Sequence, residues 1–295
     1  MAPEDLQHFI SRLEADESLL APMNLCRRLD TLDRLDALFP DSAEPIAPSL
    51  QPDAGCAAIS RRTRELRHRL EKANDAIYRS IRSQIRRNGS PEGLLQWLQR
   101  CGTKKGTVVS GLGYDHCDDL VSGVLAIQEP AVTALPPRPG MVFYQPTPVR
   151  HILRMIRGSR LAADDVLVDL GSGLGHVPLL ASVLTGTRSI GIEIEPGYVS
   201  AARACVRSLR LRRVSFVQSD ARIADLSAGS VFFLYTPFMG AILKNVLQRL
   251  RRESLSRPIR VCTFGPCTLE LAGAKWLRPM SRPAVDRVTC FRSIR

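Results

Sequence analysis

A glycine-rich turn between two apolar runs, within residues 164–195, constrains the fold of this chain more than any other feature. The first run, Val166–Leu170, is short, rich in β-branched residues and bounded by acids, which is typical of a strand buried on both faces. Three glycines follow at alternate positions, and residues 177–184 are then apolar around most of a helical circumference. Residues 189–194 form a second apolar run. The stretch therefore predicts a strand, a tight turn, a helix and a second, parallel strand.

The residues around this turn indicate the kind of ligand that it binds. Asp169 lies just before the turn, and Glu193 lies near the end of the second strand. A dinucleotide-binding turn needs a third glycine or an alanine at the position of His176, so that fingerprint is broken. A carboxylate beside the turn would repel a pyrophosphate, but it suits a ligand that carries an ammonium and a sulfonium group.

The pattern D-x-G-x-G-x-G that starts at Asp169 resembles the first motif of class I S-adenosylmethionine-dependent methyltransferases. The resemblance implies S-adenosyl-L-methionine as the cofactor, with its methionine part at the turn and its two ribose hydroxyls donating to Glu193. The cofactor-binding residues predicted from this stretch are Asp169, Gly171, Ser172, Gly173 and Glu193. The alternative is an ordinary strand–turn–helix unit whose glycines serve packing alone.

A third acid follows the next predicted strand, Arg213–Val217. By the same resemblance, Asp220 would accept the exocyclic amine of the adenine, and the backbone of Ala221 would contact the ring edge. The alternative role of Asp220 is to cap a helix that begins near Ala221. The position of Asp220, after Asp169 and Glu193 on successive strands, favours the cofactor role.

Apolar runs later in the chain complete the predicted sheet. They are Ser230–Leu234, Pro258–Phe264, Trp276–Leu277 and Val285–Ile294, with helices predicted over Pro196–Leu209 and Met239–Arg252. Strands that alternate with helices predict a parallel sheet with helices on both faces. The expected fold class is α/β, a seven-stranded Rossmann-like methyltransferase sheet over residues 140–295, preceded by an α-helical N-terminal domain.

Residues 1–139 are expected to form the mostly helical N-terminal domain, with the domain boundary near Gly140. Helical patterns cover Pro3–Leu20, Met23–Phe39, Ala57–Arg87 and Pro91–Arg100, and linkers cover residues 41–55 and 128–140. The long basic helix is expected to pack its apolar stripe on the leucine-rich helix before it, with its arginines near the acidic first 54 residues. Contact with nucleic-acid phosphates is the alternative. The N-terminal helices are also candidates for a homodimer contact.

The segment that leads into the sheet predicts an entrance helix. Thr107–Gly113 contains a β-prone run, and Leu120–Ile127 alternates weakly. Pro148 stands where a helix can begin, with Thr147 as its candidate cap. In the methyltransferase fold such a helix precedes the first strand, and the loop before it often closes over the cofactor.

Composition excludes several function classes. No apolar run approaches the ~18 residues of a membrane span, and the acidic N-terminus lacks a signal-peptide pattern, which predicts a cytoplasmic protein.

The eight cysteines are scattered, and the cluster at residues 116–119 is too close in sequence to chelate well, so no metal is expected. The net charge of +12 reflects 41 basic residues, of which five are lysines. A solvated arginine-rich surface is therefore favoured over a dedicated nucleic-acid face.

The loop after the fourth predicted strand carries the information about the methyl acceptor. Amino methyltransferases of the adenine, cytosine or glutamine type have (D/N/S)-P-P-(Y/F) here, whereas this chain has Y-T-P-F and fits only the P-F half. Thr236, Pro237 and Phe238 are the candidate substrate-binding residues. Tyr235 is the candidate catalytic residue, because it can line the acceptor channel or contact the sulfonium methyl group. Its alternative role is that of a core tyrosine at a strand end.

Over residues 141–265 the chain resembles the non-SET histone lysine methyltransferases, the disruptor-of-telomeric-silencing family. Tyr144 and Thr147 fit a Y-x-x-T loop, Asp169–Val177 fits D-L-G-S-G-x-G-x-V, and a G-(V/I)-E pattern follows in the second strand. The resemblance adds Tyr144, Thr147 and His176 to the cofactor pocket. The chain departs from the family after the fourth strand, where a tyrosine and a threonine replace paired asparagines.

These features predict a class I S-adenosylmethionine-dependent methyltransferase whose acceptor is open. A protein lysine is one candidate acceptor, and RNA or DNA reached through the basic helix at residues 57–87 is the alternative. A third reading is a cofactor-binding fold kept as a non-catalytic interaction module. The expected partner is a macromolecular substrate, with protein favoured over nucleic acid and no membrane involved.

Overall fold

The contacts within the chain separate two units, Met1–Ile81 and Arg82–Arg295. The division between them falls inside one continuous helix, α3 (Ala54–Asn88). The predicted domain boundary near Gly140 lies outside the described residues and stays a prediction. A division inside a helix leaves no proline or glycine signal in the sequence.

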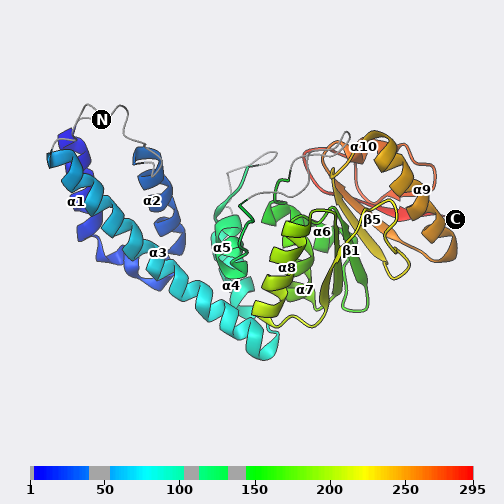
Figure 1. Ribbon diagram of the computed structural model, residues 1–295, viewed down its shortest axis with the longest axis horizontal. Coiled ribbons are helices and arrows are strands. Elements are labelled where there is room, and N and C mark those ends of the chain that lie inside the picture. Colours follow the sequence, from blue (N-terminus) through cyan, green and yellow to red (C-terminus); the bar gives the residue numbers. More distant parts are fainter. Residues whose placement is uncertain (1–2, 40–53, 103–112, 132–143, 295) are drawn as a thin grey trace. The chain divides into compact units, whose positions relative to one another are not determined.

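The computed structural model in Figure 1 describes most of the chain. The described ranges are residues 3–39, 54–102, 113–131 and 144–294. Three predicted segments lie mostly outside these ranges. They are the linkers at 41–55 and 128–140 and the β-prone run Thr107–Gly113.

Helices alone build the N-terminal unit within its described residues. They are α1 (Pro3–Ala15), the short 3₁₀ helices η1 (Glu17–Leu20) and η2 (Pro22–Asn24), α2 (Leu25–Leu38) and the first part of α3. The first predicted helix, Pro3–Leu20, is thus broken at Asp16, whose carboxylate accepts a hydrogen bond from the Ser18 hydroxyl at 2.5 Å.

The packing of this unit confirms the prediction for the long basic helix. The buried apolar side chains that join α1, η1, α2 and α3 are Ile10, Leu19, Leu35, Leu66 and Leu70. Arg62 of α3 pairs with Glu14 of α1, and Arg67 lies 2.8 Å from Asp36 of α2. The helix therefore packs its apolar stripe on its neighbours and pairs these two arginines with acids of the same unit.

A seven-stranded sheet organises the second unit. The strands are β1 (Val166–Leu170), β2 (Arg188–Glu193), β3 (Val214–Gln218), β4 (Val231–Tyr235), β5 (Arg260–Phe264), β6 (Leu277–Pro279) and β7 (Thr289–Ser293). Their order across the sheet is β3-β2-β1-β4-β5-β7-β6. Strands β1 to β5 are parallel, and β7 lies antiparallel between β5 and β6. The predicted α/β fold and its closing antiparallel pair are confirmed.

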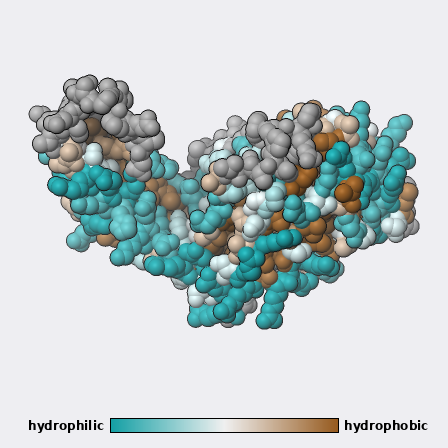
Figure 2. Space-filling model, viewed as in Figure 1, coloured by the Kyte–Doolittle hydropathy of each residue, from teal (hydrophilic) through white to brown (hydrophobic). Residues whose placement is uncertain are grey.

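Helices cover both faces of this sheet (Figure 1). On one face lie α6 (Val149–Ser159), α7 (His176–Thr185) and α8 (Pro196–Leu209). On the other lie α9 (Gly240–Ser256) and the short α10 (Cys267–Ala272), which the sequence had not predicted. Side chains of β1, β4, β5 and β7 meet α9 and α10 in one buried apolar cluster. Hydrophilic side chains dominate the visible surface of each unit (Figure 2).

Two helices ahead of the sheet belong to the same unit. They are α4 (Glu92–Cys101) and α5 (His116–Leu125), which contact one another, and α5 also contacts α6. The weak alternation over Leu120–Ile127 is thus mostly helical. A capping box starts α5: Asp115 accepts from the Cys117 backbone, and Asp118 accepts from the Asp115 backbone, each at 2.8 Å.

The strand order brings the ends of β3, β2, β1 and β4 to one edge of the sheet. Ligands of parallel α/β sheets bind outside the carboxyl ends of the strands, near the point where the strand order reverses. Here that point lies between β1 and β4, which pair through Asp169 and Phe233.

Among the helices that the structure describes, none is long and apolar enough to cross a membrane. Nor do the described ranges hold a group of three metal-ligating side chains.

Candidate active site

The turn after β1 is shaped by three glycines with left-handed backbone conformations. Gly171, Gly173 and Gly175 have φ angles of 79°, 51° and 86°. The backbone N–H groups of Gly171 and Ser172 both donate to the carbonyl oxygen of Ile192, at 2.9 and 3.0 Å. These bonds hold the turn against the end of β2.

Two of the glycines allow other segments to approach the turn closely. A Cβ atom at Gly171 would lie 2.3 Å from the Cβ of Pro237, and one at Gly173 would lie 2.2 Å from the ring of Tyr144. Such distances are far shorter than a van der Waals contact, so only glycine fits. The loop after β4 and the loop before α6 therefore both rest on the β1 turn. These glycines therefore do serve packing, which was the alternative role predicted for them. The same packing brings predicted site residues together at the turn.

Two buried carboxyl groups lie at the turn. Asp169 is 3% exposed and Glu193 is 9% exposed. Burial raises the pKa of Asp169 well above its usual range, and the nearby charge of Glu193 raises it further. The Glu193 carboxylate accepts backbone N–H groups from Gly173, Ile194 and Glu195 at 2.8 to 2.9 Å. An acid that is desolvated beside another acid is suited to a cationic ligand.

A buried hydroxyl adds to the polar groups available at the turn. Ser172 is 7% exposed, and its Oγ makes no hydrogen bond within the described part of the chain. A buried polar atom without a partner is costly unless a ligand or water satisfies it. With the acid at Asp169, this hydroxyl fits an ammonium-bearing ligand. The donor and acceptor set at the turn fits S-adenosylmethionine.

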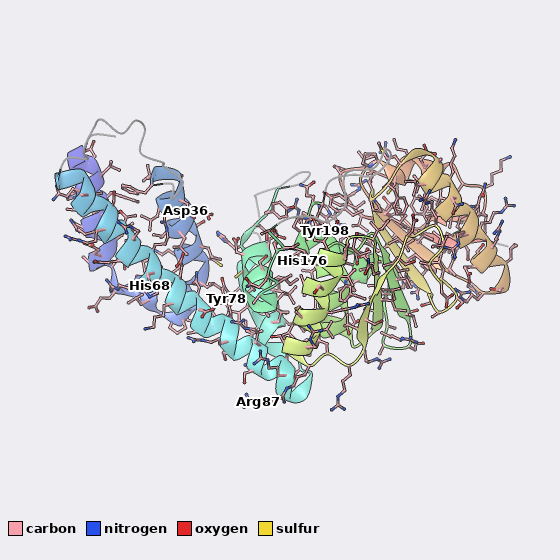
Figure 3. The ribbon with its side chains drawn as sticks, viewed as in Figure 1. Asp36, His68, Tyr78, Arg87, His176 and Tyr198 are labelled. Atoms are coloured by element: carbon pink, nitrogen blue, oxygen red, sulfur yellow. The ribbon has the colours of Figure 1, made fainter. Side chains whose placement is uncertain are left out.

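Aromatic side chains cover the start of α7. The Tyr144 hydroxyl lies 3.2 Å from Nδ1 of His176, and its ring lies 5.0 Å from the ring of Tyr198, centre to centre. Figure 3 labels His176 and Tyr198 in this part of the unit. Burial lowers the pKa of His176 to about 4 and raises that of Tyr144. The structure thus brings Tyr144, His176 and Gly173 together, as predicted, and adds Tyr198, which carried no motif.

Thr147 lies near these residues, but it does not cap α6. The capping residue is Pro148, and no side chain of its own caps the helix. Instead Asp118 of α5 accepts a hydrogen bond from the backbone N–H of Val149 at 2.7 Å. Thr147 is 8% exposed, and its predicted place in the cofactor pocket stays a prediction. A cap from a distant helix could not be read from local sequence.

The loop after β3 differs in part from its predicted role. Asp220 Oδ2 lies 2.7 Å from the Arg222 guanidinium, and Asp220 Oδ1 accepts from the Arg222 backbone at 2.8 Å. Residues 221–224 form a turn, so the alternative that Asp220 caps a helix there is wrong. The side chain of Ala221 is buried in the core. The Ser219 backbone donates to the Glu193 carbonyl at 2.9 Å, which holds this loop beside the end of β2.

Tyr235 ends β4 in a stack of aromatic rings. Its ring lies 4.6 Å from the ring of Phe264, and the His151 ring lies 4.0 Å from the ring of Phe264, each measured between centroids. Burial raises the pKa of Tyr235 to about 12. The Tyr235 hydroxyl donates to Oε1 of Gln145 at 3.2 Å, so the residue is a part-buried strand end whose polar tip remains at the edge of the site.

The rest of this loop packs inward. Thr236 adopts φ 34°, and its hydroxyl donates to the Phe264 carbonyl at 2.9 Å and accepts from the Cys267 backbone at 3.3 Å. Phe238 is 6% exposed and belongs to the apolar core, and Pro237 lies against Gly171. Thr236 therefore shapes the loop and Phe238 fills the core, and the substrate contacts predicted for them stay a prediction. Sequence spacing could not reveal which way each side chain turns.

Comparison with known proteins bears on the first half of this site. The family model described as "Histone methylation protein DOT1" matches residues 142–231. This segment is DOT1-like. The match contains the β1 turn, Glu193 and Asp220, and it ends before Tyr235. The predicted resemblance to that family is confirmed for this segment.

Curated relatives match a shorter stretch. Two proteins named "Histone-lysine N-methyltransferase, H3 lysine-79 specific", from two strains of Cryptococcus neoformans, are 42% identical to this chain over 66 residues. The match covers 22% of this chain and spans about a tenth (10%) of the length of those relatives. The match therefore concerns a short stretch of each protein.

Solved structures match about half of the chain at low overall similarity. An RNA methyltransferase from Salinibacter ruber in complex with S-adenosyl-L-homocysteine is 28% identical, with a TM-score of 0.40, over 50% of this chain and 92% of its own. A precorrin-6y C5,15-methyltransferase from Geobacter metallireducens is 18% identical, with a TM-score of 0.40, over 52% of this chain and 94% of its own.

Proposed function

We propose that the protein transfers a methyl group from S-adenosylmethionine to the side-chain amine of a lysine in another protein. The observation that carries this proposal is the buried pair Asp169 and Glu193 at the glycine turn. That pair lies inside residues 142–231, the segment similar to the DOT1 family, and 66 residues of the chain are similar to H3 lysine-79 methyltransferases. A protein substrate, the cytoplasmic location and a homodimer through the N-terminal helices belong to the proposal as well.

The chain's own residues supply the cofactor contacts. Asp169 would lie at the ammonium of the methionine part, where a positive charge offsets the desolvation of two neighbouring acids. Glu193 would accept from the ribose hydroxyls, and the Ser172 hydroxyl has no partner of its own within the described residues. Tyr144 and His176 would cover the turn. When bound, S-adenosylmethionine supplies a methyl group on a sulfonium sulfur that leaves as a neutral thioether.

The acceptor nitrogen has to present a lone pair. A lysine ammonium has a pKa of about 10.4 in water, and removal from water lowers that pKa, so the amine loses its proton to solvent on binding. The nitrogen–carbon bond then forms as the carbon–sulfur bond breaks, and the methylated ammonium can release one proton to water. Tyr235 remains protonated at neutral pH, because burial raises its pKa to about 12. Tyr235 would orient the acceptor nitrogen, and such alignment of the reacting groups speeds methyl transfer.

Binding of S-adenosylmethionine tests the cofactor half of the proposal. We expect the Asp169→Ala and Glu193→Ala variants to bind it much more weakly than the wild type in equilibrium dialysis. Asp164→Ala is a matched control, because Asp164 is an exposed acid just before β1. Wild-type affinity in both site variants would overturn the assignment of the turn.

Transfer of a labelled methyl group identifies the acceptor class. The wild-type protein and labelled S-adenosylmethionine are added to a cell lysate that has been treated with nuclease, with protease or with neither. The proposal predicts label that survives nuclease, is lost with protease and is recovered as methyl-lysine after acid hydrolysis. Label that nuclease removes would overturn the protein substrate in favour of RNA or DNA. No label in any fraction, with cofactor binding intact, would favour a non-catalytic module.

A further inference from the structure

Gln145 joins two tyrosines that lie far apart in the sequence. Its Oε1 accepts from the Tyr235 hydroxyl at the end of β4, at 3.2 Å. On its other side lies Tyr114, just before α5: burial raises the pKa of Tyr114, and a hydrogen bond with Gln145 opposes that rise. The Tyr114 hydroxyl donates to the Pro146 carbonyl at 2.9 Å. The amide of Gln145 therefore stands between two phenol groups.

Adjacent residues of this loop contact opposite halves of the site. Tyr144 rests on Gly173 and reaches His176, at the cofactor turn. Gln145, the next residue, reaches Tyr235, on the strand whose end lies beside that of β1. In extended backbone successive side chains point to opposite sides, which accounts for this division. One short loop thus contacts the cofactor turn through Tyr144 and the Tyr235 hydroxyl through Gln145.

The start of α5 fixes this loop in place. Asp118 accepts from the Val149 backbone at 2.7 Å, and the Arg150 guanidinium donates to the Gly113 carbonyl. With the bond from Tyr114 to Pro146, three contacts hold residues 146–150 against residues 113–118. Tyr114 is 47% exposed, so its ring is available to a ligand while its hydroxyl is anchored.

The chemistry of this group suits a neutral amine. An amide oxygen can accept an amine N–H, and the two phenols are uncharged at neutral pH. Asp118 is the nearby acid, but both its oxygens already accept backbone N–H groups. The face of Tyr235 can contact the methylated ammonium after transfer. Groups without charge bind the uncharged amine without stabilising the ammonium that has to be lost.

We propose that Gln145, held between Tyr114 and Tyr235, forms the acceptor-binding site and orients a lysine amine for methyl transfer. The proposal rests on the proposed function, and it places part of the substrate site at Tyr114, just before α5 and outside the DOT1-like segment. Tyr114 and Gln145 are specificity residues of this site, and Tyr235 presents the ring and the hydroxyl that complete it.

The test measures cofactor binding and acceptor use separately. The acceptor is the total protein of a nuclease-treated lysate, and the readouts are the protein concentration that gives half-maximal methyl transfer, the maximal rate, and the Kd for S-adenosylmethionine. We expect Gln145→Ala to raise the half-saturating protein concentration about threefold to tenfold, because the variant loses one or two hydrogen bonds to neutral groups. The Kd for the cofactor should stay within about twofold of wild type. Gln248→Ala, at an exposed glutamine of α9, is the matched control.

An isosteric variant separates orientation from packing. Gln145→Glu keeps the shape of the side chain but adds a negative charge, which holds the amine as ammonium. We expect its maximal rate to fall while its half-saturating concentration does not rise, a split that a purely structural role would not produce. Acceptor use at the wild-type level in both Gln145 variants would overturn the inference alone. No transfer by the wild-type protein, with cofactor binding intact, would overturn the proposed function and this inference with it.

Discussion

The cofactor half and the acceptor half of the site are built in different ways. The cofactor half is local: the β1 turn and the end of β2 lie within residues 164–195, and the DOT1 family model covers them. The proposed acceptor half is assembled from residues 113–118, residues 145–150 and Tyr235, which only the fold brings together. The proposed cofactor contacts thus come mostly from one continuous motif. The proposed acceptor contacts depend on tertiary contacts between distant segments.

The largest expected effect is at Asp169. Asp169→Asn should weaken binding of S-adenosylmethionine by about 100-fold, because a charge-assisted hydrogen bond contributes up to about 3 kcal/mol. The same variant should be more stable than wild type without ligand at neutral pH. The folded-state pKa of Asp169 is raised, so its contribution to stability is present below the unfolded pKa and is lost as pH rises through the folded pKa.

Equilibrium dialysis and thermal unfolding of the ligand-free protein measure the two effects. Asp164→Asn should change neither. A destabilised Asp169→Asn variant would contradict the view that this acid is held for the ligand at the expense of stability.

The next effect tests how closely the loop before α6 approaches the turn. Gly173→Ala places a methyl group 2.2 Å from the Tyr144 ring at φ 51°, so we expect both a loss of stability of about 2 kcal/mol and weaker cofactor binding. Gly186→Ala is the control, because Gly186 has φ 70° with no atom within 4 Å. It should cost about 1 kcal/mol, from backbone strain alone. Urea unfolding and cofactor titration of the pair give the comparison. Equal losses in the two variants would contradict the close contact.

His176 should make the ligand-free protein sensitive to mild acid. Burial lowers its pKa to about 4, so the unfolded chain binds a proton that the folded chain does not between pH 6.5 and about 4. Its contribution to stability is present above the unfolded pKa and falls as pH decreases through this window, by about 2 kcal/mol at pH 5 and about 3 kcal/mol at pH 4. Urea unfolding at a series of pH values should show a flatter profile for His176→Gln. Identical profiles would place the acid sensitivity elsewhere.

The smallest effect separates the two halves most cleanly. Tyr235→Phe removes the hydroxyl that donates to Gln145 but keeps the ring on Phe264. We expect about a threefold rise in the half-saturating acceptor concentration, from one neutral hydrogen bond. The cofactor Kd should not change, because the Tyr235 hydroxyl donates to Gln145 and the ring on Phe264 is kept. A weaker cofactor Kd with normal acceptor use would reverse the assignment of the two halves.

Much of the fold could be predicted because its signals are local. Buried parallel strands such as Val166–Leu170 are recognisable from short apolar runs, and the glycine turn from its spacing. The ten-residue helix α5 was missed because its apolar residues also fit a weak strand alternation, and its capping box needed Asp115 and Asp118 to be read together. The division into two units could not be predicted, because it falls within α3, where the sequence is continuously helical.

The candidate site divides in the same way. Asp169, Glu193 and the glycines follow from a motif, and Tyr144 and His176 follow from the family resemblance. Gln145 and Tyr114 carry no motif, and their partners lie on other elements. The direction in which Phe238 turns is decided by the core that α9 completes. Spacing along the chain does not contain that information.

The most direct test of the account measures cofactor Kd and half-saturating acceptor concentration on the same preparations of wild type, Asp169→Ala and Gln145→Ala. The account predicts a crossed pattern. Asp169→Ala loses cofactor affinity, whereas Gln145→Ala keeps the cofactor Kd of wild type and requires about threefold to tenfold more acceptor. Wild-type cofactor affinity in Asp169→Ala, or a loss of cofactor affinity in Gln145→Ala, would contradict it.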